Sequence, residues 1–147
     1  MRIIVINGPN INMLGIREPE IYGRQTYDDL VAFVEAAFDE AGVEGEIYQS
    51  NHEGDIVDRI QKAYHKADGI VLNAGAYTHT SVAILDALKA VDIPTVEVHL
   101  TDTDNREAFR KTSYISLFAE KVIKGKGFEG YREAIRYLAQ SRRNADA

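Results

Sequence analysis

The chain contains no cysteine, and only 3 of its 147 residues are proline. Without cysteine it has neither disulfides nor thiolate metal ligands, so it is indifferent to redox compartment and the cytoplasm is the default expectation. No apolar run approaches the roughly 20 residues that a membrane-spanning helix needs, and the residues after Met1 lead into a strand-like run rather than a signal peptide. The chain also has fewer basic than acidic residues, 17 against 23, which gives a net charge of −6. This balance argues against nucleic-acid or membrane-surface binding as the main role.

Short apolar runs alternate instead with amphipathic helical patterns. The expected strands are Ile3–Ile6, Gly45–Gln49, Gly69–Leu72, Thr95–Val98 and Val122–Ile123. The expected helices run from Leu30 to a stop at Gly42, from Ile56 to Tyr64, from Val82 to Val91 and from Phe128 to Leu138. We expect one domain over residues 1–147, with a flexible polar tail at 141–147.

This alternation predicts an α/β fold in which a five-stranded parallel sheet lies between two layers of helices. Five strands suit a flavodoxin-like three-layer sandwich with strand order 2-1-3-4-5. In such sheets ligands bind at the carboxyl ends of the strands, near the point where the strand order reverses.

Residues 7–23 form a long loop directly after the first expected strand. A loop of this length early in a compact domain is usually a lid or a binding loop rather than a connector. It carries Arg17 and Tyr22 between Gly15 and Gly23. A cation near a phenol favours the phenolate, so this loop is a candidate for base chemistry.

Polar side chains follow each of the first four expected strands. The segments that carry them are Asn7, Asn10 and Asn12, then residues 50–53, then residues 73–81, and finally His99-Leu100-Thr101 with Arg106 and Arg110. Taken singly, each also has an ordinary structural explanation: the asparagines could satisfy turns, and the histidines could be packing or surface residues. Together they predict a polar ligand site, and the arginines favour a small carboxylate.

Several common sites are not indicated. The turn at Asn7–Asn10 lacks the glycine spacing of a dinucleotide site, and the chain has neither a phosphate-binding P-loop nor a Gly-x-Ser-x-Gly elbow. His52, His79 and His99 could in principle bind a metal, but the chain lacks a His-Glu-x-x-His motif or another close ligand pair, so we expect no metal.

Five blocks of this sequence resemble type II 3-dehydroquinate dehydratase. The similarity covers residues 1 to about 139. The blocks are residues 7–23, His52-Glu-Gly54, residues 73–83, Glu97-Val-His99 and Arg106-Glu-Ala-Phe-Arg110. The family converts 3-dehydroquinate to 3-dehydroshikimate in the shikimate or quinate pathway, without a cofactor, by eliminating water through an enolate. The resemblance implies a hydro-lyase whose substrate is a small carboxylate.

By position, the resemblance assigns catalytic roles to five residues. Tyr22 would be the base that removes a proton beside the ketone, and Arg17 would favour its tyrosinate form. Asn10 would hold a water that supports the enolate. His99 would protonate the departing hydroxyl, and Glu97 would orient that imidazole from the same face of the strand.

The resemblance also implies substrate-binding residues and an assembly. Asp86 would reach the site of a neighbouring subunit, because the family forms homododecamers built as tetramers of trimers. The substrate-binding residues of the site itself would be Asn73, His79 and Arg110, with the backbone amides of Leu100 and Thr101.

Four positions depart from the family pattern. Leu85 stands where arginine is frequent, and Ala74, Asp102 and Asp104 stand where proline, asparagine and histidine are frequent. The two acids, near the carboxylate pocket, could weaken substrate binding, and Leu85 could remove one contact between subunits.

The alternative function is a flavodoxin-like binding or signalling module without catalysis, although a phosphorylated receiver would need acids where Asn7 and Asn73 stand.

Overall fold

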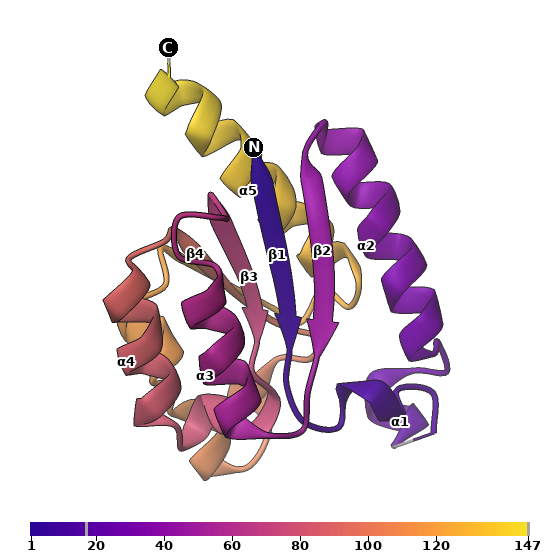
Figure 1. The fold of residues 1–147 in the computed structure, drawn as a ribbon. Coiled ribbons are helices and arrows are strands. Elements are labelled where there is room, and N and C mark those ends of the chain that lie inside the picture. Colours follow the sequence, from indigo (N-terminus) through magenta and orange to yellow (C-terminus); the bar gives the residue numbers. More distant parts are fainter. Residues whose placement is uncertain (17, 147) are drawn as a thin grey trace.

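The computed structural model describes residues 1–16 and 18–146 and contains one five-stranded parallel sheet (Figure 1). Its strands are β1 (Arg2–Asn7), β2 (Glu44–Gln49), β3 (Gly69–Asn73), β4 (Thr95–His99) and β5 (Lys121–Lys124). The strand order is β2-β1-β3-β4-β5 and every neighbouring pair is parallel. The predicted fold class and strand order are therefore confirmed.

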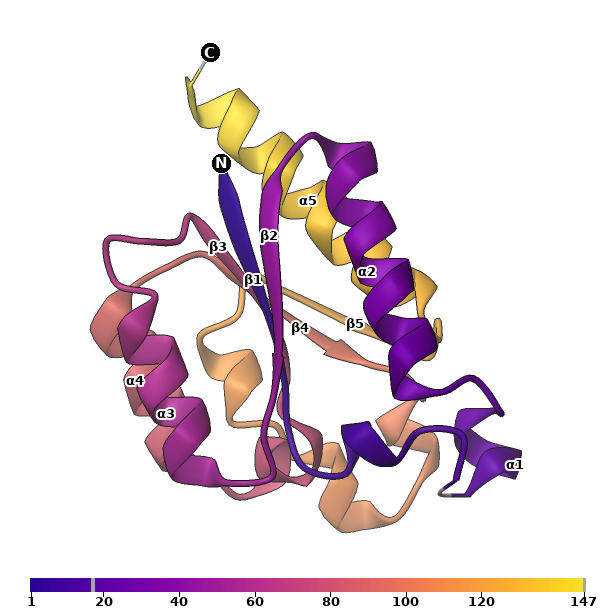
Figure 2. The same ribbon diagram turned by 45° about the vertical axis from the view of Figure 1, so that its right-hand side comes forward.

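Helices cover both faces of this sheet. The helices are α1 (Pro19–Tyr22), α2 (Tyr27–Ala41), α3 (Glu53–Lys62), α4 (Val82–Val91) and α5 (Glu129–Asp146). Figure 2 shows the sheet nearly edge-on, with α2 and α5 on one side and α3 and α4 on the other. Because both faces are covered, β1 and β3 carry unbroken apolar runs, Ile3–Ile6 and Ile70–Leu72, rather than an alternating pattern.

Successive side chains along a strand pack alternately into two separate hydrophobic cores, one on each face of the sheet. Ile3 and Val5 pack with α2 and α5, whereas Ile4 and Ile6 pack with α3 and α4. The same alternation holds in β4, where Val96 and Val98 belong to the first core. Glu97 therefore points to the other face of the sheet, although the residues beside it are core residues.

Helix boundaries follow local capping chemistry. Thr26 caps α2 by accepting a hydrogen bond from the backbone N–H of Asp29, whose carboxylate accepts one in return from the N–H of Thr26. Gly42 ends α2 in the left-handed conformation, with φ of 68°, as its sequence position predicts. Ser81 caps α4 in the same way as Thr26 caps α2, through the N–H of Ile84.

Two helix ends differ from the expected ones. Helix α3 stops at Lys62 rather than Tyr64, because the chain turns there and His65 takes a left-handed φ of 60°. Helix α5 continues past Leu138 to Asp146. Its last turns are held by tertiary contacts, since Arg142 pairs with Asp68 and Arg143 donates a hydrogen bond to the carbonyl of Ala41.

The two edges of the sheet differ in character. The chain ends lie at the amino edge, where β1 begins, whereas the carboxyl edge gathers loops and short helices (Figures 1 and 2). Five 3₁₀ segments connect the main elements: η1 (Ile11–Met13), η2 (Gly75–His79), η3 (Thr103–Asn105), η4 (Ala108–Lys111) and η5 (Ile115–Leu117). Among the described residues, no helix is both long and apolar enough to cross a membrane.

Candidate active site

A polar cavity lies at the carboxyl ends of β1, β3 and β4, where the strand order reverses. Its volume is about 90 Å³. Residues from four separate parts of the chain line it: Pro9, Asn10, Ile11, Asn73, Gly75, Ala76, His79, His99, Leu100, Thr101, Thr103, Arg106 and Arg110. The structure thus brings together ten residues that the sequence placed at this edge.

Two glycines let the loops that form this cavity touch each other. The N–H of Gly8 donates to the carbonyl of Asn73 at 2.7 Å, and a side chain at Gly8 would meet the carbonyl oxygen of Ala74 at 2.3 Å. Gly75 has a φ of 60°, and a side chain there would press against the carbonyl oxygen of Pro9. The β1 and β3 loops therefore pack backbone to backbone, which only glycine permits.

His99 is the best-supported candidate for proton transfer. Its Nε2 lies 2.5 Å from Oε2 of Glu97, and both side chains are buried. Because a carboxylate only accepts, Nε2 carries the proton, and Nδ1 remains as the other ring nitrogen. The hydroxyl of Ser113 lies 2.9 Å from each oxygen of Glu97 and donates to that carboxylate. The ring of His99 is therefore held by a buried charged group that is itself held in place.

The second histidine of the cavity, His79, is held by Thr112, the residue before Ser113. His79 Nδ1 lies 2.7 Å from the carbonyl oxygen of Thr112. A carbonyl only accepts, so Nδ1 is the donor and neutral His79 has Nε2 as an acceptor. Thr112 and Ser113 thus set the tautomers of both histidines, directly for His79 and through Glu97 for His99.

Two arginines give the cavity positive charge. Arg110 donates from Nε to Glu107 at 2.7 Å, and Arg106 pairs with Glu18 of the long loop at 3.7 Å. The pKa of the exposed Glu107 carboxyl is lowered by a hydrogen bond from its own backbone N–H and by Arg110. Guanidinium groups at such a site suit a small carboxylate ligand, as the sequence predicted.

The asparagines of the cavity are held in different ways. Asn10 adopts a left-handed φ of 69°, which asparagine tolerates, and its N–H donates to Oδ1 of Asn51. Asn73 is buried; its Oδ1 accepts from the N–H of Gly75 and its Nδ2 donates to the hydroxyl of Tyr131.

Some predicted site residues lie elsewhere. Asn7 is fully buried below the cavity and accepts a hydrogen bond from Tyr131. His52 precedes α3 outside the cavity, because β2 lies on the far side of β1 from β3. Asp86 is exposed on α4 and does not line the cavity of its own chain. Arg17 and the side chain of Tyr22 lie outside the part of the chain that the structure describes.

The departures from the family pattern are accommodated locally. Asp102 caps η3 through the N–H of Asp104, and Asp104 pairs with Lys124 at 2.8 Å. Neither acid lines the cavity, so neither opposes a carboxylate there at close range. Leu85 and Ala74 are buried.

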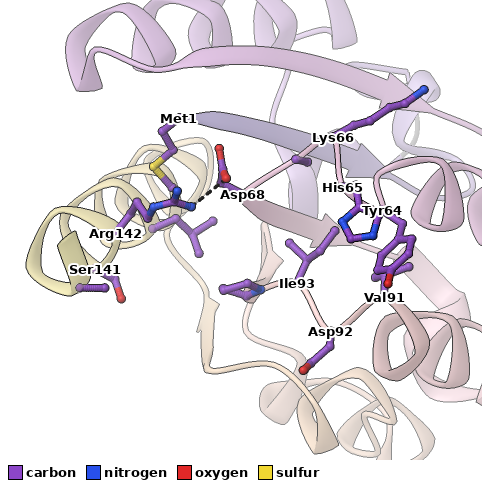
Figure 3. Close-up of a pocket in the computed structure, with 14 residues that line it drawn as sticks. Met1, Tyr64, His65, Lys66, Asp68, Val91, Asp92, Ile93, Ser141 and Arg142 are labelled. Atoms are coloured by element: carbon purple, nitrogen blue, oxygen red, sulfur yellow. Dashed lines mark hydrogen bonds and ion pairs between the residues drawn. The ribbon is translucent and has the colours of Figure 1, made fainter.

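A larger cavity of about 580 Å³ lies at the opposite, amino edge of the sheet (Figure 3). Arg142 and Asp68 pair across it at 2.7 Å, and the rings of Tyr64 and His65 stack with centroids 3.8 Å apart. Asp68 and Arg142 thus neutralise each other, and ligands of parallel α/β sheets bind at the other edge. The smaller cavity is therefore the candidate active site.

Comparison with known proteins agrees with this geometry. The family model "Dehydroquinase class II" matches residues 1–139. The chain belongs to the class II dehydroquinase family. The predicted enzyme class, a hydro-lyase, is confirmed by this membership. Within the described residues there is no cluster of three or more side chains suited to hold a metal ion.

Individual relatives of this dehydroquinase family are similar along nearly their whole length. A "3-dehydroquinate dehydratase 1" of Corynebacterium efficiens is 52% identical over 140 residues, which are 95% of this chain and 93% of that protein. A "Catabolic 3-dehydroquinase" of Aspergillus clavatus is 53% identical over 93% of this chain and 91% of its own length. The crystal structure of type II dehydroquinase from Butyrivibrio crossotus has a TM-score of 0.92 and 49% identity, covering 94% of this chain and 97% of that one.

Three residues that support this dehydroquinase site were not predicted from the sequence. Thr112 and Ser113 hold the two histidines, and Tyr131 holds Asn73. Ser113 lies 16 residues from Glu97, and Tyr131 lies 58 residues from Asn73. No local sequence pattern signals contacts between residues so far apart.

Proposed function

We propose that this chain converts 3-dehydroquinate to 3-dehydroshikimate by an anti elimination of water through an enolate. The observation that carries the proposal is the position of His99, which is backed by buried Glu97 and faces a cavity that Asn73, His79 and Arg110 also line. Family membership supports the choice of substrate, because relatives carry the names 3-dehydroquinate dehydratase and 3-dehydroquinase.

The reaction begins with removal of a proton from the carbon next to the ketone. Tyr22, as tyrosinate, takes that proton, and Arg17 supplies the positive charge that favours the phenolate. A free tyrosine has a pKa of about 10, so a nearby cation is needed for useful base strength near neutrality. The electrons move into the ketone oxygen to form the enolate, which a water held by Asn10 stabilises.

The second step expels the hydroxyl on the neighbouring carbon. His99 gives its proton to that hydroxyl, which leaves as water while the enolate electrons form the new carbon–carbon double bond. Nε2 of His99 keeps the proton that it donates to Glu97, so the transferred proton comes from Nδ1 of the doubly protonated imidazolium. General acid catalysis of this kind typically contributes about 10²–10⁴-fold to the rate.

Substrate binding uses the rest of the cavity. Arg110 and the amides of Leu100 and Thr101 bind the carboxylate, while Asn73 and His79 bind hydroxyl groups. No lysine lines the described cavity, which favours an enolate over an imine. The chemistry proposed needs neither a metal nor a cofactor.

The direct test is turnover of 3-dehydroquinate by the purified protein without added metal or nucleotide, followed by the ultraviolet absorbance of the conjugated product. Substrate deuterated at either of the two hydrogens beside the ketone distinguishes the geometry, since anti elimination loses only the hydrogen opposite the hydroxyl. Inactivation by borohydride in the presence of substrate would overturn the enolate route. Saturable flavin binding without turnover would favour the binding-module alternative.

Two variants test the roles of the proposed acid and base. Tyr22→Phe is expected to lose nearly all turnover and still bind substrate, and His99→Ala is expected to lose turnover as well. Wild-type turnover in either variant would remove that residue from its assigned role.

We also propose that the chain works as a homododecamer of four trimers, in which Asp86 completes a neighbouring site. Asp86 is exposed on α4, one turn from Val82, which is 49% exposed. Leu117 on η5, a segment that packs against α4, is 70% exposed. Apolar side chains around an acid suit contact with a second copy. A clean monomer at micromolar concentration in light scattering would reject the assembly.

A further inference from the structure

Tyr131 is a fully buried polar residue to which the proposed reaction gives no part. It lies in the first turns of α5, none of its surface is exposed, and α5 packs against β3 and β4. Its hydroxyl donates to Oδ1 of Asn7 at 2.6 Å and accepts from Nδ2 of Asn73 at 2.9 Å. Asn7 and Asn73 end β1 and β3 and are partners in the strand register. The hydroxyl therefore ties together the two strand ends below the cavity.

The direction of these hydrogen bonds follows from the chemistry of the groups. Burial raises the pKa of Tyr131 well above its usual value, so the hydroxyl keeps its single proton at any working pH. That proton goes to Asn7, so Asn73 must be the donor. At the other end of the Asn73 amide, the N–H of Gly75 can only donate, so Oδ1 of Asn73 must be the acceptor.

The Gly75 N–H can only donate, so it fixes Oδ1 of Asn73 as the acceptor and leaves Nδ2 as the donor to the Tyr131 hydroxyl. One N–H of Nδ2 is given to Tyr131, which leaves the second N–H for a ligand in the cavity that Asn73 lines. Without the tyrosine hydroxyl, only the 3.2 Å bond from Gly75 would hold the amide. A donor that is held in place before the ligand arrives loses less entropy on binding.

We propose that Tyr131 is a positioning residue, which acts on substrate binding by fixing the amide of Asn73 as a donor to the ligand. This inference rests on the proposed function for its ligand and goes beyond it in naming the residue and its route of action. Tyr131 does not line the cavity, so its effect on the ligand passes through Asn73.

The test compares Tyr131→Phe with wild type on 3-dehydroquinate. Phenylalanine fills the same volume, so the variant is expected to fold. We expect KM to rise about tenfold, the effect of losing one buried hydrogen bond, while kcat changes less than threefold. Tyr137→Phe is the matched control, since Tyr137 lies on the same helix and its hydroxyl meets Glu120 at the surface. The control is expected to keep the wild-type KM.

A loss of stability alone would leave KM unchanged in the folded enzyme, so KM separates positioning from a structural role. The route through Asn73 is tested in an Asn73→Ala background, where adding Tyr131→Phe should change KM by less than twofold. A wild-type KM in Tyr131→Phe, or a full effect in the Asn73→Ala background, would overturn the proposal.

Crystal structures of wild type and Tyr131→Phe test the positioning role independently of the proposed function. The Asn73 amide should turn or become disordered in the variant, whatever the substrate is. An unmoved amide with a water in place of the hydroxyl would overturn the positioning role. Absence of wild-type turnover would instead reject the proposed function and leave the structural comparison valid.

Discussion

Replacing Glu97 by glutamine is the sharpest probe of the proton-transfer machinery. Glutamine keeps the shape of the side chain and can still accept a hydrogen bond from Ser113, but it has no charge. Glu97 is 1% exposed and lies 2.5 Å from Nε2 of His99, so no solvent replaces the lost charge. The imidazolium that His99 must form to donate from Nδ1 would then be uncompensated.

The magnitude follows from the strength of the contact. Hydrogen bonds to charged groups contribute about 1.5–3 kcal/mol, and each 1.36 kcal/mol in the barrier changes the rate about tenfold. We therefore expect Glu97→Gln to lower kcat about 10- to 150-fold. Since Glu97 does not line the cavity, KM should stay within about threefold of wild type.

Steady-state kinetics on Glu97→Gln, His99→Ala and the double variant test this reasoning. If Glu97 acts through His99, the double variant should be no slower than His99→Ala. Glu133→Gln is the matched control, because Glu133 pairs with Lys126 on the surface, where such pairs contribute little. A kcat of Glu97→Gln above half the wild-type value would refute the argument, as would a further tenfold loss in the double variant.

Three further predictions concern stability in urea or on titration. Gly8→Ala should destabilise the fold by about 1–3 kcal/mol, because its Cβ would meet the Ala74 backbone, whereas Gly54→Ala, with open space, should not. Asp68→Asn should destabilise the fold at pH 7 by at most about 1 kcal/mol, because a hydrogen bond from the Arg2 N–H and the contact with Arg142 lower the pKa of Asp68. This contribution of Asp68 is present above the ordinary aspartate pKa of about 3.9 and is lost as pH falls through the lowered pKa. Burial raises the pKa of Tyr131, so stability should decline as pH rises above about 10, and Tyr131→Phe should reduce that decline.

The sheet could be predicted from the sequence because its physics is local. Each strand is a short apolar run and each helix has an apolar face, and parallel topology with right-handed crossovers leaves few arrangements. The end of α5 could not be predicted in this way. Residues beyond Leu138 are polar, and they stay helical because Arg142 and Arg143 reach Asp68 and Ala41, which are distant in sequence.

The candidate site was predictable to the extent that strand ends converge. Asn73, His79, His99 and Arg110 do line one cavity, as strand-end placement predicts. His52 does not, because the reversal point lies between β1 and β3 and the residues after β2 fall on its far side. Strand-end position alone does not say how far each strand lies from that point.

Asn7 illustrates a different limit. Its position after β1 suggested either a turn residue or a ligand contact, and it is neither of these. The side chain points into the protein and meets Tyr131, 124 residues further along the chain. Polar residues at a strand end can therefore form the support beneath a site as well as its surface, and only the tertiary structure separates the two.

The binding groups and the proposed acid of the site are held by fixed partners, and this constrains how Arg17 and Tyr22 must act. His79, His99 and Asn73 each have a fixed partner before any ligand arrives: Thr112, Glu97 and Tyr131. The later part of the long loop, residues 15–23, instead contacts the cavity through Glu18, which pairs with Arg106. If Tyr22 and Arg17 act as proposed, the acid and the binding groups are pre-organised while the base is delivered by the loop. Changes in the supports should then alter binding or acid strength separately, whereas changes in the loop should alter KM and kcat together.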